Sequence, residues 1–176
     1  INDFATVGNN LWISSETNIL SIHLQENLDS TFSYFDFTDD GTNILGSLDK
    51  VEDLQYDKDQ NVVYAGTDRG LYAFDLELNS VRRITKEDGL ISNSIFEIDY
   101  QDSILFVQSG QGLNLIKDGK IRSITEEDGL FITSFKRNSI HQIDSANIVL
   151  RGFNDDFKFN FQDLYETDTI SEIKLF

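Results

Sequence analysis

Hydrophobic and polar residues alternate with a period of two along most of the chain, and no segment shows the 3.6-residue period of an amphipathic helix. Residues 62–65 and 71–74 are short apolar runs rich in β-branched and aromatic side chains. Polar turns at residues 57–61 and 67–70 bound these runs, and Asp-Gly at residues 118–119 is a strong two-residue hairpin sequence. The pattern predicts an all-β protein of short antiparallel strands joined by tight turns.

This strand pattern is repeated along the chain. Residues 84–90 (ITKEDGL) recur as residues 124–130 (ITEEDGL), and Gly70-Leu71 upstream of the first copy is matched by Gly112-Leu113 upstream of the second. Weaker matches extend the repeat to both ends, and four units of about 44 residues account for the whole chain.

Residues 11–14 in the first unit take the place of residues 62–65 in the second. Four strands repeated every 40 to 50 residues are typical of β-propeller blades. We therefore predict one propeller segment of about four four-stranded blades, with approximate boundaries at residues 1–41, 42–90, 91–130 and 131–176.

An open arc of four blades leaves the outer faces of its two terminal blades uncovered. Three arrangements would cover them: closure as a four-bladed ring, association with a second copy as a homodimer, or attachment to further blades. The chain contains no Met and opens at Ile1. We therefore expect a piece of a larger propeller, capped by the remaining blades of the parent chain or by a second copy.

The repeats resemble the two-component regulator propeller family, whose blades carry a strand ending in Gly-Thr, a Gly-Leu third strand and a Gly-Leu-x-x-Asn/Ser crossover. Residues 64–72 (YAGTDRGLY) match the strands best, and residues 88–95 (DGLISNSI) match the crossover. Residues 11–15 (LWISS) are similar to a degraded Trp-Ile-Gly-Thr strand. The match is specific in the second and third units and looser in the first and fourth.

This resemblance implies the periplasmic sensor region of a hybrid two-component histidine kinase/response regulator of the Bacteroidetes type, which responds to glycans. Propellers of that family have more than four blades, commonly about seven. Similar propellers also occur in a surface-associated secretion accessory protein.

The composition narrows the choice of partners. Fourteen Lys and Arg against 31 Asp and Glu give a formal net charge of −17, which argues against nucleic acid as a partner. No apolar run approaches the ~20 residues that a membrane-spanning helix needs, so we expect no direct membrane insertion. The chain has no Cys, which excludes disulfides and thiolate chemistry.

One spacing is that of a calcium-binding loop: Asp57, Asp59, Asn61 and Asp68 stand at its positions 1, 3, 5 and 12. However, the residue at the Gly position is Val62, inside an apolar strand, and turn residues between strands explain the same letters. We interpret them as turns and predict no metal site.

The acidic groups Glu87-Asp88 and Glu126-Glu127-Asp128 could be paired carboxylates for glycoside hydrolysis. Because they recur at the same position of each repeat, we interpret them as structural turns. His23 and His141, the only histidines, lie in alternating strands without metal-ligand spacing. Residues 110–112 are interpreted as a hairpin turn, and we predict no catalytic residue and no cofactor.

Glycan recognition uses aromatic platforms and planar hydrogen-bonding groups. Arg69, in a turn before a third strand, and Trp12, the single Trp, are the two candidate ligand-binding residues. Core packing is the competing interpretation for Trp12, and a surface ion pair with Asp68 is the competing one for Arg69.

The sequence thus predicts an extracytoplasmic, periplasmic sensor segment that has no enzyme activity of its own. It would receive a glycan-type signal, with an oligosaccharide as its ligand, and pass the signal to a kinase outside this chain. A structural or protein-interaction propeller of a cell-surface secretion accessory protein is the alternative. A propeller glycan hydrolase or lyase is the third hypothesis.

Overall fold

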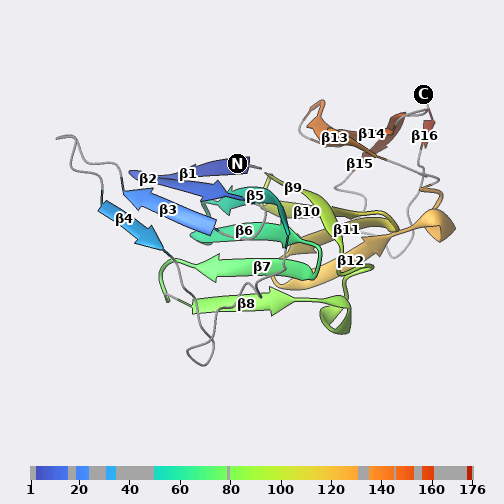
Figure 1. Ribbon diagram of the computed structural model, residues 1–176. Helices are drawn as coiled ribbons and strands as arrows, with labels where there is room; N and C mark the ends of the chain where they lie inside the picture. The colour runs from blue at the N-terminus through green and yellow to red at the C-terminus, as the bar shows by residue number, and fades with distance from the viewer. Residues whose placement is uncertain are drawn as a thin grey trace.

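The computed structural model describes residues 3–15, 19–23, 31–34, 50–78, 80–130, 135–144, 146–152, 156–160 and 174–175. These residues form four antiparallel sheets of four strands each, and no α-helix lies among them (Figure 1). The predicted all-β propeller segment of four blades is confirmed.

Blade 1 contains β1 (Asp3–Val7), β2 (Asn10–Ser14), β3 (Ile19–His23) and β4 (Thr31–Tyr34). Blade 2 contains β5 (Val51–Asp57), β6 (Val62–Thr67), β7 (Gly70–Asp75) and β8 (Ser80–Ile84). Blade 3 contains β9 (Ile95–Gln101), β10 (Ile104–Ser109), β11 (Gly112–Lys117) and β12 (Lys120–Ile124). Blade 4 contains β13 (Phe135–Gln142), β14 (Asn147–Gly152), β15 (Asp156–Asn160) and β16 (Lys174–Leu175).

Each blade is a meander in which strands pair in chain order, so its first strand lies at one edge of the sheet. These four edge strands, β1, β5, β9 and β13, are the inner strands. β1 contacts β5, β5 contacts β9, and β9 contacts β13, so the blades fan out from a common inner side (Figure 1).

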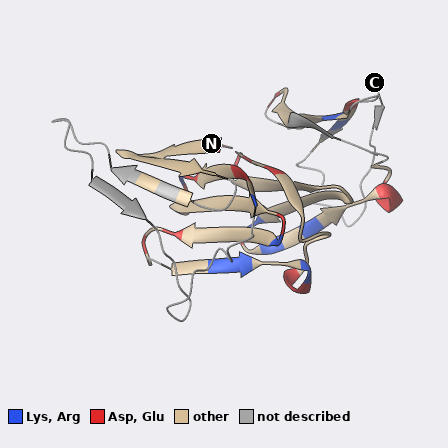
Figure 2. Cartoon of the chain, in the orientation of Figure 1, with Lys and Arg blue, Asp and Glu red and all other residues tan. Residues whose placement is uncertain are grey.

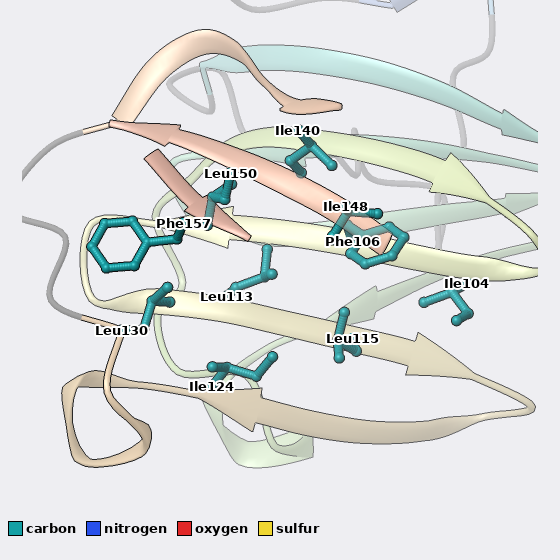
Figure 3. Close-up of a cluster of buried hydrophobic side chains, with 10 residues drawn as sticks. All are labelled: Ile104, Phe106, Leu113, Leu115, Ile124, Leu130, Ile140, Ile148, Leu150 and Phe157. Atoms are coloured by element: carbon teal, nitrogen blue, oxygen red, sulfur yellow. The ribbon is translucent and has the colours of Figure 1, made fainter. Parts of the chain in front are cut away.

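Hydrophobic side chains fill the space between consecutive blades. We call the face of a blade that looks toward the next blade its forward face, and the opposite one its rear face. Three clusters join blades 1 and 2, blades 2 and 3, and blades 3 and 4. Figure 3 shows the third cluster, in which Phe106 and Leu115 of blade 3 meet Ile148 and Leu150 of blade 4.

The register of the first hairpin in each blade decides which side chains enter these clusters. Trp12 pairs with Ala5, Tyr64 with Gln55, and Phe106 with Asp99. Trp12 packs against blade 2, Tyr64 against blade 3 and Phe106 against blade 4, so these three aromatic residues hold equivalent forward positions.

The predicted equivalence of residues 11–14 with residues 62–65 is therefore wrong by one residue, because it paired Trp12 with Val63. Val63 packs on the rear face of blade 2, against blade 1. Since successive strand side chains point to opposite faces, a shift of one residue exchanges the two faces.

The recurring acidic turns are short 3₁₀ helices, η1 (Lys86–Asp88) and η2 (Glu126–Asp128), at the crossovers between blades. In η1 the Asp88 carboxylate accepts the backbone N–H of Thr85 at 2.9 Å, and the Thr85 hydroxyl accepts the N–H of Glu87. Thr125 and Asp128 form the same capping box in η2. These contacts agree with the interpretation of both acidic pairs as structural turns.

Glycine at the start of the third strands of blades 2 and 3, β7 and β11, permits a close backbone approach. At Gly112, where φ is +145°, a Cβ atom would lie 2.4 Å from the Ile124 carbonyl oxygen. Gly119 also has a positive φ, +72°, but no atom lies within 4 Å of the place a Cβ would take.

We therefore expect Gly112→Ala to lower the free energy of unfolding by about 3 kcal/mol. The new Cβ atom would force the backbone at Ile124 to shift, and the alanine would also have to keep a strained positive φ. Gly119→Ala is the matched control and is expected to cost about 1 kcal/mol, for backbone strain alone. Urea unfolding of both variants measures the difference, and equal losses would contradict the close approach at Gly112.

Candidate functional site

The four inner strands line a common open groove with a volume of about 580 Å³, here called the inner groove. Residues of β1, β5, β9 and β13 all contribute to its wall. The acidic side chains in the wall are Asp3, Asp53, Glu97 and Asp99. The inner groove is thus a concave surface to which every blade contributes, and its charge is negative.

Three of these carboxylates hydrogen-bond to the backbone of the next blade. Asp3 Oδ2 accepts the N–H of Leu54 at 2.9 Å, and Asp53 Oδ2 accepts the N–H of Ile98 at 2.7 Å. Glu97 Oε1 accepts the N–H of Ser139 at 2.8 Å. One carboxylate per blade therefore bridges to the following inner strand.

These bridges have a physical cause in the sheet topology. An inner strand is an edge strand, so alternate N–H groups point away from its neighbour and lack a ladder partner. Burying such a group without a hydrogen bond would cost free energy. A carboxyl group from the preceding blade satisfies it with a hydrogen bond.

The bond to Glu97 is the most enclosed of the three. Glu97 and Ser139 are both buried, and the Ser139 hydroxyl also donates to Glu97 Oε2 at 2.9 Å. Glu97 bonds to the N–H of Ser139, the residue directly before the buried Ile140. The shorter side chains of Asp3 and Asp53 bond instead to the N–H of the buried residue itself, which is Leu54 for Asp3 and Ile98 for Asp53.

Burial shifts the proton affinity of these acids. It raises the pKa of Asp53 from 3.8 to about 8, and a hydrogen bond with the Asp3 side chain contributes further to the increase. Burial also raises the pKa values of Glu97 and Asp99 above their usual range.

A second set of bonds joins the blades at the turns between their first and second strands. The hydroxyls of Tyr100 and Ser103 donate to Asp59 Oδ2 at 2.8 and 2.9 Å. These bonds lower the pKa of Asp59. In the next blade pair, Gln142 Nε2 donates to Asp102 Oδ2 at 2.7 Å.

The residues with calcium-loop spacing lie in two separate turns. Asp57 Oδ1 accepts the N–H groups of Asp59 and Gln60, each at 2.9 Å, and closes the turn between β5 and β6. The Asn61 side chain accepts the Tyr56 hydroxyl, and Asp68, in the turn after β6, accepts the N–H of Lys50. No group of three or more potential metal-ligating side chains occurs among the residues that the structure describes.

The two candidate ligand-binding residues lie in different environments, since Trp12 is buried and Arg69 is exposed. Trp12 is 1 % exposed and packs in the core, with its ring centroid 5.7 Å from that of Phe74. This burial agrees with the packing interpretation and leaves no ring face for a sugar. Arg69 is exposed in the turn between β6 and β7, and its role as a ligand-binding residue stays a prediction.

Of the two histidines, His141 lies in β13, is exposed and lines the inner groove. His23 lies in β3, and its side chain is outside the described residues. Thr6 and Gln55 also line the groove. Like the side chain of His141, which interacts electrostatically with Asp99, their side chains make no hydrogen bond to any other part of the chain that the structure describes, so we expect them to be able to contact a ligand.

The inner groove was not predicted from the sequence, although a pattern for it exists. Each of its bridging acids directly precedes an apolar residue of the inner strand, which is buried in Asp53-Leu54 and Glu97-Ile98 and exposed in Asp3-Phe4. Aligning the repeats on these pairs would have separated the bridging acids from those in solvated turns. Figure 2 shows that further Asp and Glu residues lie in turns and at the two 3₁₀ helices.

No protein-family model matches the sequence, and no curated protein matches it. Among solved structures, the extracellular domain of a B. thetaiotaomicron protein described as a hybrid two-component system, BT3049, is similar with a TM-score of 0.68 and 15% identity. That alignment covers 99% of this chain and 24% of the other.

Two more structures are similar over 99% of this chain and 22% of theirs. The extracellular domain of a second such B. thetaiotaomicron protein, BT4673, has a TM-score of 0.65 and 17% identity. PorZ, a surface component of the type-IX secretion system of Porphyromonas gingivalis, has a TM-score of 0.67 and 11% identity.

At these identities the likeness establishes the fold, and this chain spans less than a quarter of each of the three proteins. The resemblance to sensor propellers that the sequence suggested is thus confirmed at the level of the fold. None of the described helices is long and apolar enough to cross a bilayer.

The raised pKa of Asp53 predicts how stability depends on pH. The folded protein holds this proton more tightly than the unfolded chain, so the free energy of unfolding should fall as pH rises from about 4 to about 8. Asp53→Asn cannot ionise and should reduce the loss between pH 5.5 and 8.5 by roughly 1–3 kcal/mol.

The matched control is Asp144→Asn. Hydrogen bonds from the Ala146 N–H and the Asn147 side chain lower the pKa of Asp144, so that group stays ionised throughout this range and the pH dependence should not change. Urea unfolding at several pH values tests both variants. A loss as steep in Asp53→Asn as in the natural chain would contradict the raised pKa of Asp53.

Proposed function

We propose that this chain is a blade-bearing part of an extracytoplasmic sensor of a hybrid two-component system. The observation that carries the proposal is its fold likeness, over 99% of its length, to the extracellular domains of two proteins described as such systems. The kinase that such a sensor would control lies outside this chain.

We propose the inner groove as the place where the signal is received. It is formed by all four blades, so a ligand bound there would contact every blade at once. Its volume of about 580 Å³ is within the range of small-molecule sites. A ligand that bound more tightly to one spacing of the blades than to another would shift the equilibrium toward the spacing that it binds. Signalling requires such a shift between two states.

A neutral glycan suits the chemistry of this groove. The donors and acceptors free to meet it are Thr6, Gln55 and His141, which can hydrogen-bond sugar hydroxyls. The acidic side chains of the wall that are ionised would repel sulfated or uronic sugars.

The carboxylates themselves support a binding role rather than catalysis. Asp3, Asp53 and Glu97 are held by backbone N–H groups, and Asp99 accepts bonds from the Tyr100 N–H and the Gln101 side chain. A glycosidase needs one carboxyl group aimed at the scissile oxygen and a second at the sugar carbon or its water. We therefore propose that the segment is not an enzyme.

A surface accessory role is the second candidate, because PorZ is about as similar in fold as the sensor domains are. In that role the propeller would hold a protein partner and the inner groove would need no sugar. Binding of a free oligosaccharide therefore separates the two.

Calorimetry of the purified chain against a panel of neutral oligosaccharides and their sulfated or uronic counterparts tests the sensor proposal. We expect a neutral member to bind, with at least tenfold weaker binding of its anionic counterpart. Gln55→Ala and His141→Ala should each weaken binding about tenfold, which corresponds to ~1.4 kcal/mol.

Lys120→Ala, an exposed change in the hairpin between β11 and β12, is the matched control and should leave affinity unchanged. Equal binding of neutral and anionic sugars would remove the charge argument. Binding that persists in both groove variants would place the site elsewhere. Absence of any sugar binding would favour the accessory role.

A further inference from the structure

A second cavity lies between blades 2 and 3 and is here called the interblade cleft. Its volume is about 320 Å³, at the lower end of the range for small-molecule sites. The cleft shares no wall residue with the inner groove, and every residue of its wall belongs to the described part of the chain. Exposed wall residues in or beside turns, Gln60, Ser80 and Gly119, mark its opening.

The small side chain of Ala73 accounts for this cavity. In blade 2, Ala73 pairs with Tyr64 on the forward face. In blade 3 the equivalent pair is Leu115 and Phe106, and Leu115 is fully buried against blade 4 (Figure 3). Because Ala73 is shorter than Leu115, it leaves room between blades 2 and 3 at a place that is filled between blades 3 and 4.

Tyr64 is a buried polar residue of the cleft wall. It is 7 % exposed, and its hydroxyl makes no hydrogen bond to any residue that the structure describes. A buried hydroxyl without a hydrogen bond costs free energy. Phe106 holds the equivalent position in blade 3, so packing at this place does not need a hydroxyl. The Tyr64 hydroxyl is therefore available to a ligand in the cleft.

Two carboxyl groups lie in the same wall. Asp57 and Asp75 pair with Val62 from its two sides, so they share the forward face with Tyr64. Asp75 Oδ1 accepts two backbone N–H groups of its own turn, at 3.0 and 2.8 Å, and Asp75 Oδ2 accepts none from the described residues. Burial, and then the charges of Asp57 and Asp75, raise the pKa of Tyr64 to about 12. The hydroxyl is thus neutral and lies in the field of both carboxylates.

The one cation in the wall, Arg82, is engaged outside the cleft. Its guanidinium donates to Asp88 Oδ1 at 3.2 Å, and its side chain is 71 % exposed. Asp88 belongs to η1 and does not line the cleft. The polar end of the cleft therefore carries the negative charge of the two carboxylates.

The wall that faces these carboxylates is hydrophobic. Leu105, Ile116 and Ile121 form it on the rear face of blade 3. A ligand that suits both walls has an apolar body and a single cationic group, because an ammonium group can donate to carboxylates and to a hydroxyl oxygen at once.

We propose that the interblade cleft binds a small organic cation, with its ammonium group at Asp57, Asp75 and the Tyr64 hydroxyl oxygen and its apolar body against blade 3. Since the walls belong to two blades, the bound cation bridges them. This second site does not depend on the ligand proposed for the inner groove.

Calorimetry of the full chain with 2-phenylethylamine tests the proposal, with 2-phenylethanol as the neutral analogue and 3-phenylpropanoate as the anionic one. We expect the amine to bind with a Kd below about 1 mM and each analogue to bind at least tenfold more weakly. No binding of the amine, or equal binding of either analogue, would overturn the proposal.

Three variants test the wall residues. Ala73→Leu introduces the residue of blade 3 and should abolish amine binding without lowering the melting temperature, because it fills the cavity. Tyr64→Phe should weaken binding about fivefold, for loss of the hydroxyl. Asp75→Asn keeps an acceptor for its turn and should weaken binding about tenfold, for loss of the charge.

Asp144→Asn is the matched control for Asp75→Asn. Asp144 Oδ1 likewise accepts two backbone N–H groups of its own turn, each at 2.9 Å, but Asp144 does not line the cleft. Amine affinity should be unchanged in this variant. An equal loss in Asp144→Asn and Asp75→Asn would show a general charge effect and would overturn the proposal.

Methyl NMR distinguishes the cleft from the inner groove, which is also acidic. The amine should shift the methyl signals of Ile116 and Ile121 and leave those of Ile98 and Ile140, which line the inner groove, in place. Shifts confined to Ile98 and Ile140, or amine binding that persists in Ala73→Leu, would place the cation in the inner groove and overturn the proposal.

Discussion

The unpaired N–H groups of the inner edge strands are the constraint on which the rest of this structure depends. A blade ends on its inner side with a strand that has a ladder neighbour on one side only, so alternate N–H groups of that strand point away from the sheet. Asp3, Asp53 and Glu97 solve this by reaching from one blade to the backbone of the next. The same bonds fix the distance between inner strands, so the apolar side chains of adjacent blades meet in register and the three interblade clusters can close.

The inner groove is a consequence of the same arrangement. Because the bridging acids belong to the inner strands, they line the concave side of the arc and give it negative charge. Their oxygens are largely engaged with backbone, so the side chains left to meet a ligand are the neutral ones between them, such as Gln55 and Thr6. A ligand held by several inner strands would act directly on the spacing that the carboxylates set. In this way one set of bonds links the stability of the blades to the signal that we propose they receive.

Much of the fold could be predicted from local sequence, because strands and turns are local. Alternation in residues 62–74 predicted two strands, and the repeated Glu-Asp-Gly element predicted crossovers that proved to be capped by Thr85 and Thr125. The groove could not be found in this way. An acid such as Asp53 looks like any solvated acid until its partner is known, and that partner is a backbone group 45 residues away. The register of Trp12 was wrong for a related reason, since the face of a strand is decided by the neighbouring blade.

Native-state hydrogen exchange at the Leu54 and Ile98 amides tests the central claim most directly. Both N–H groups bond to a carboxylate of the preceding blade, and the N–H of Leu54 also bonds to Asp53 Oδ1 at 3.1 Å. If these bonds hold the blades together, both amides should exchange as slowly as ladder amides of the core, and Asp3→Asn should speed exchange at Leu54 far more than at Ile98. Exchange at the rate of an exposed edge strand in the natural chain would contradict the account.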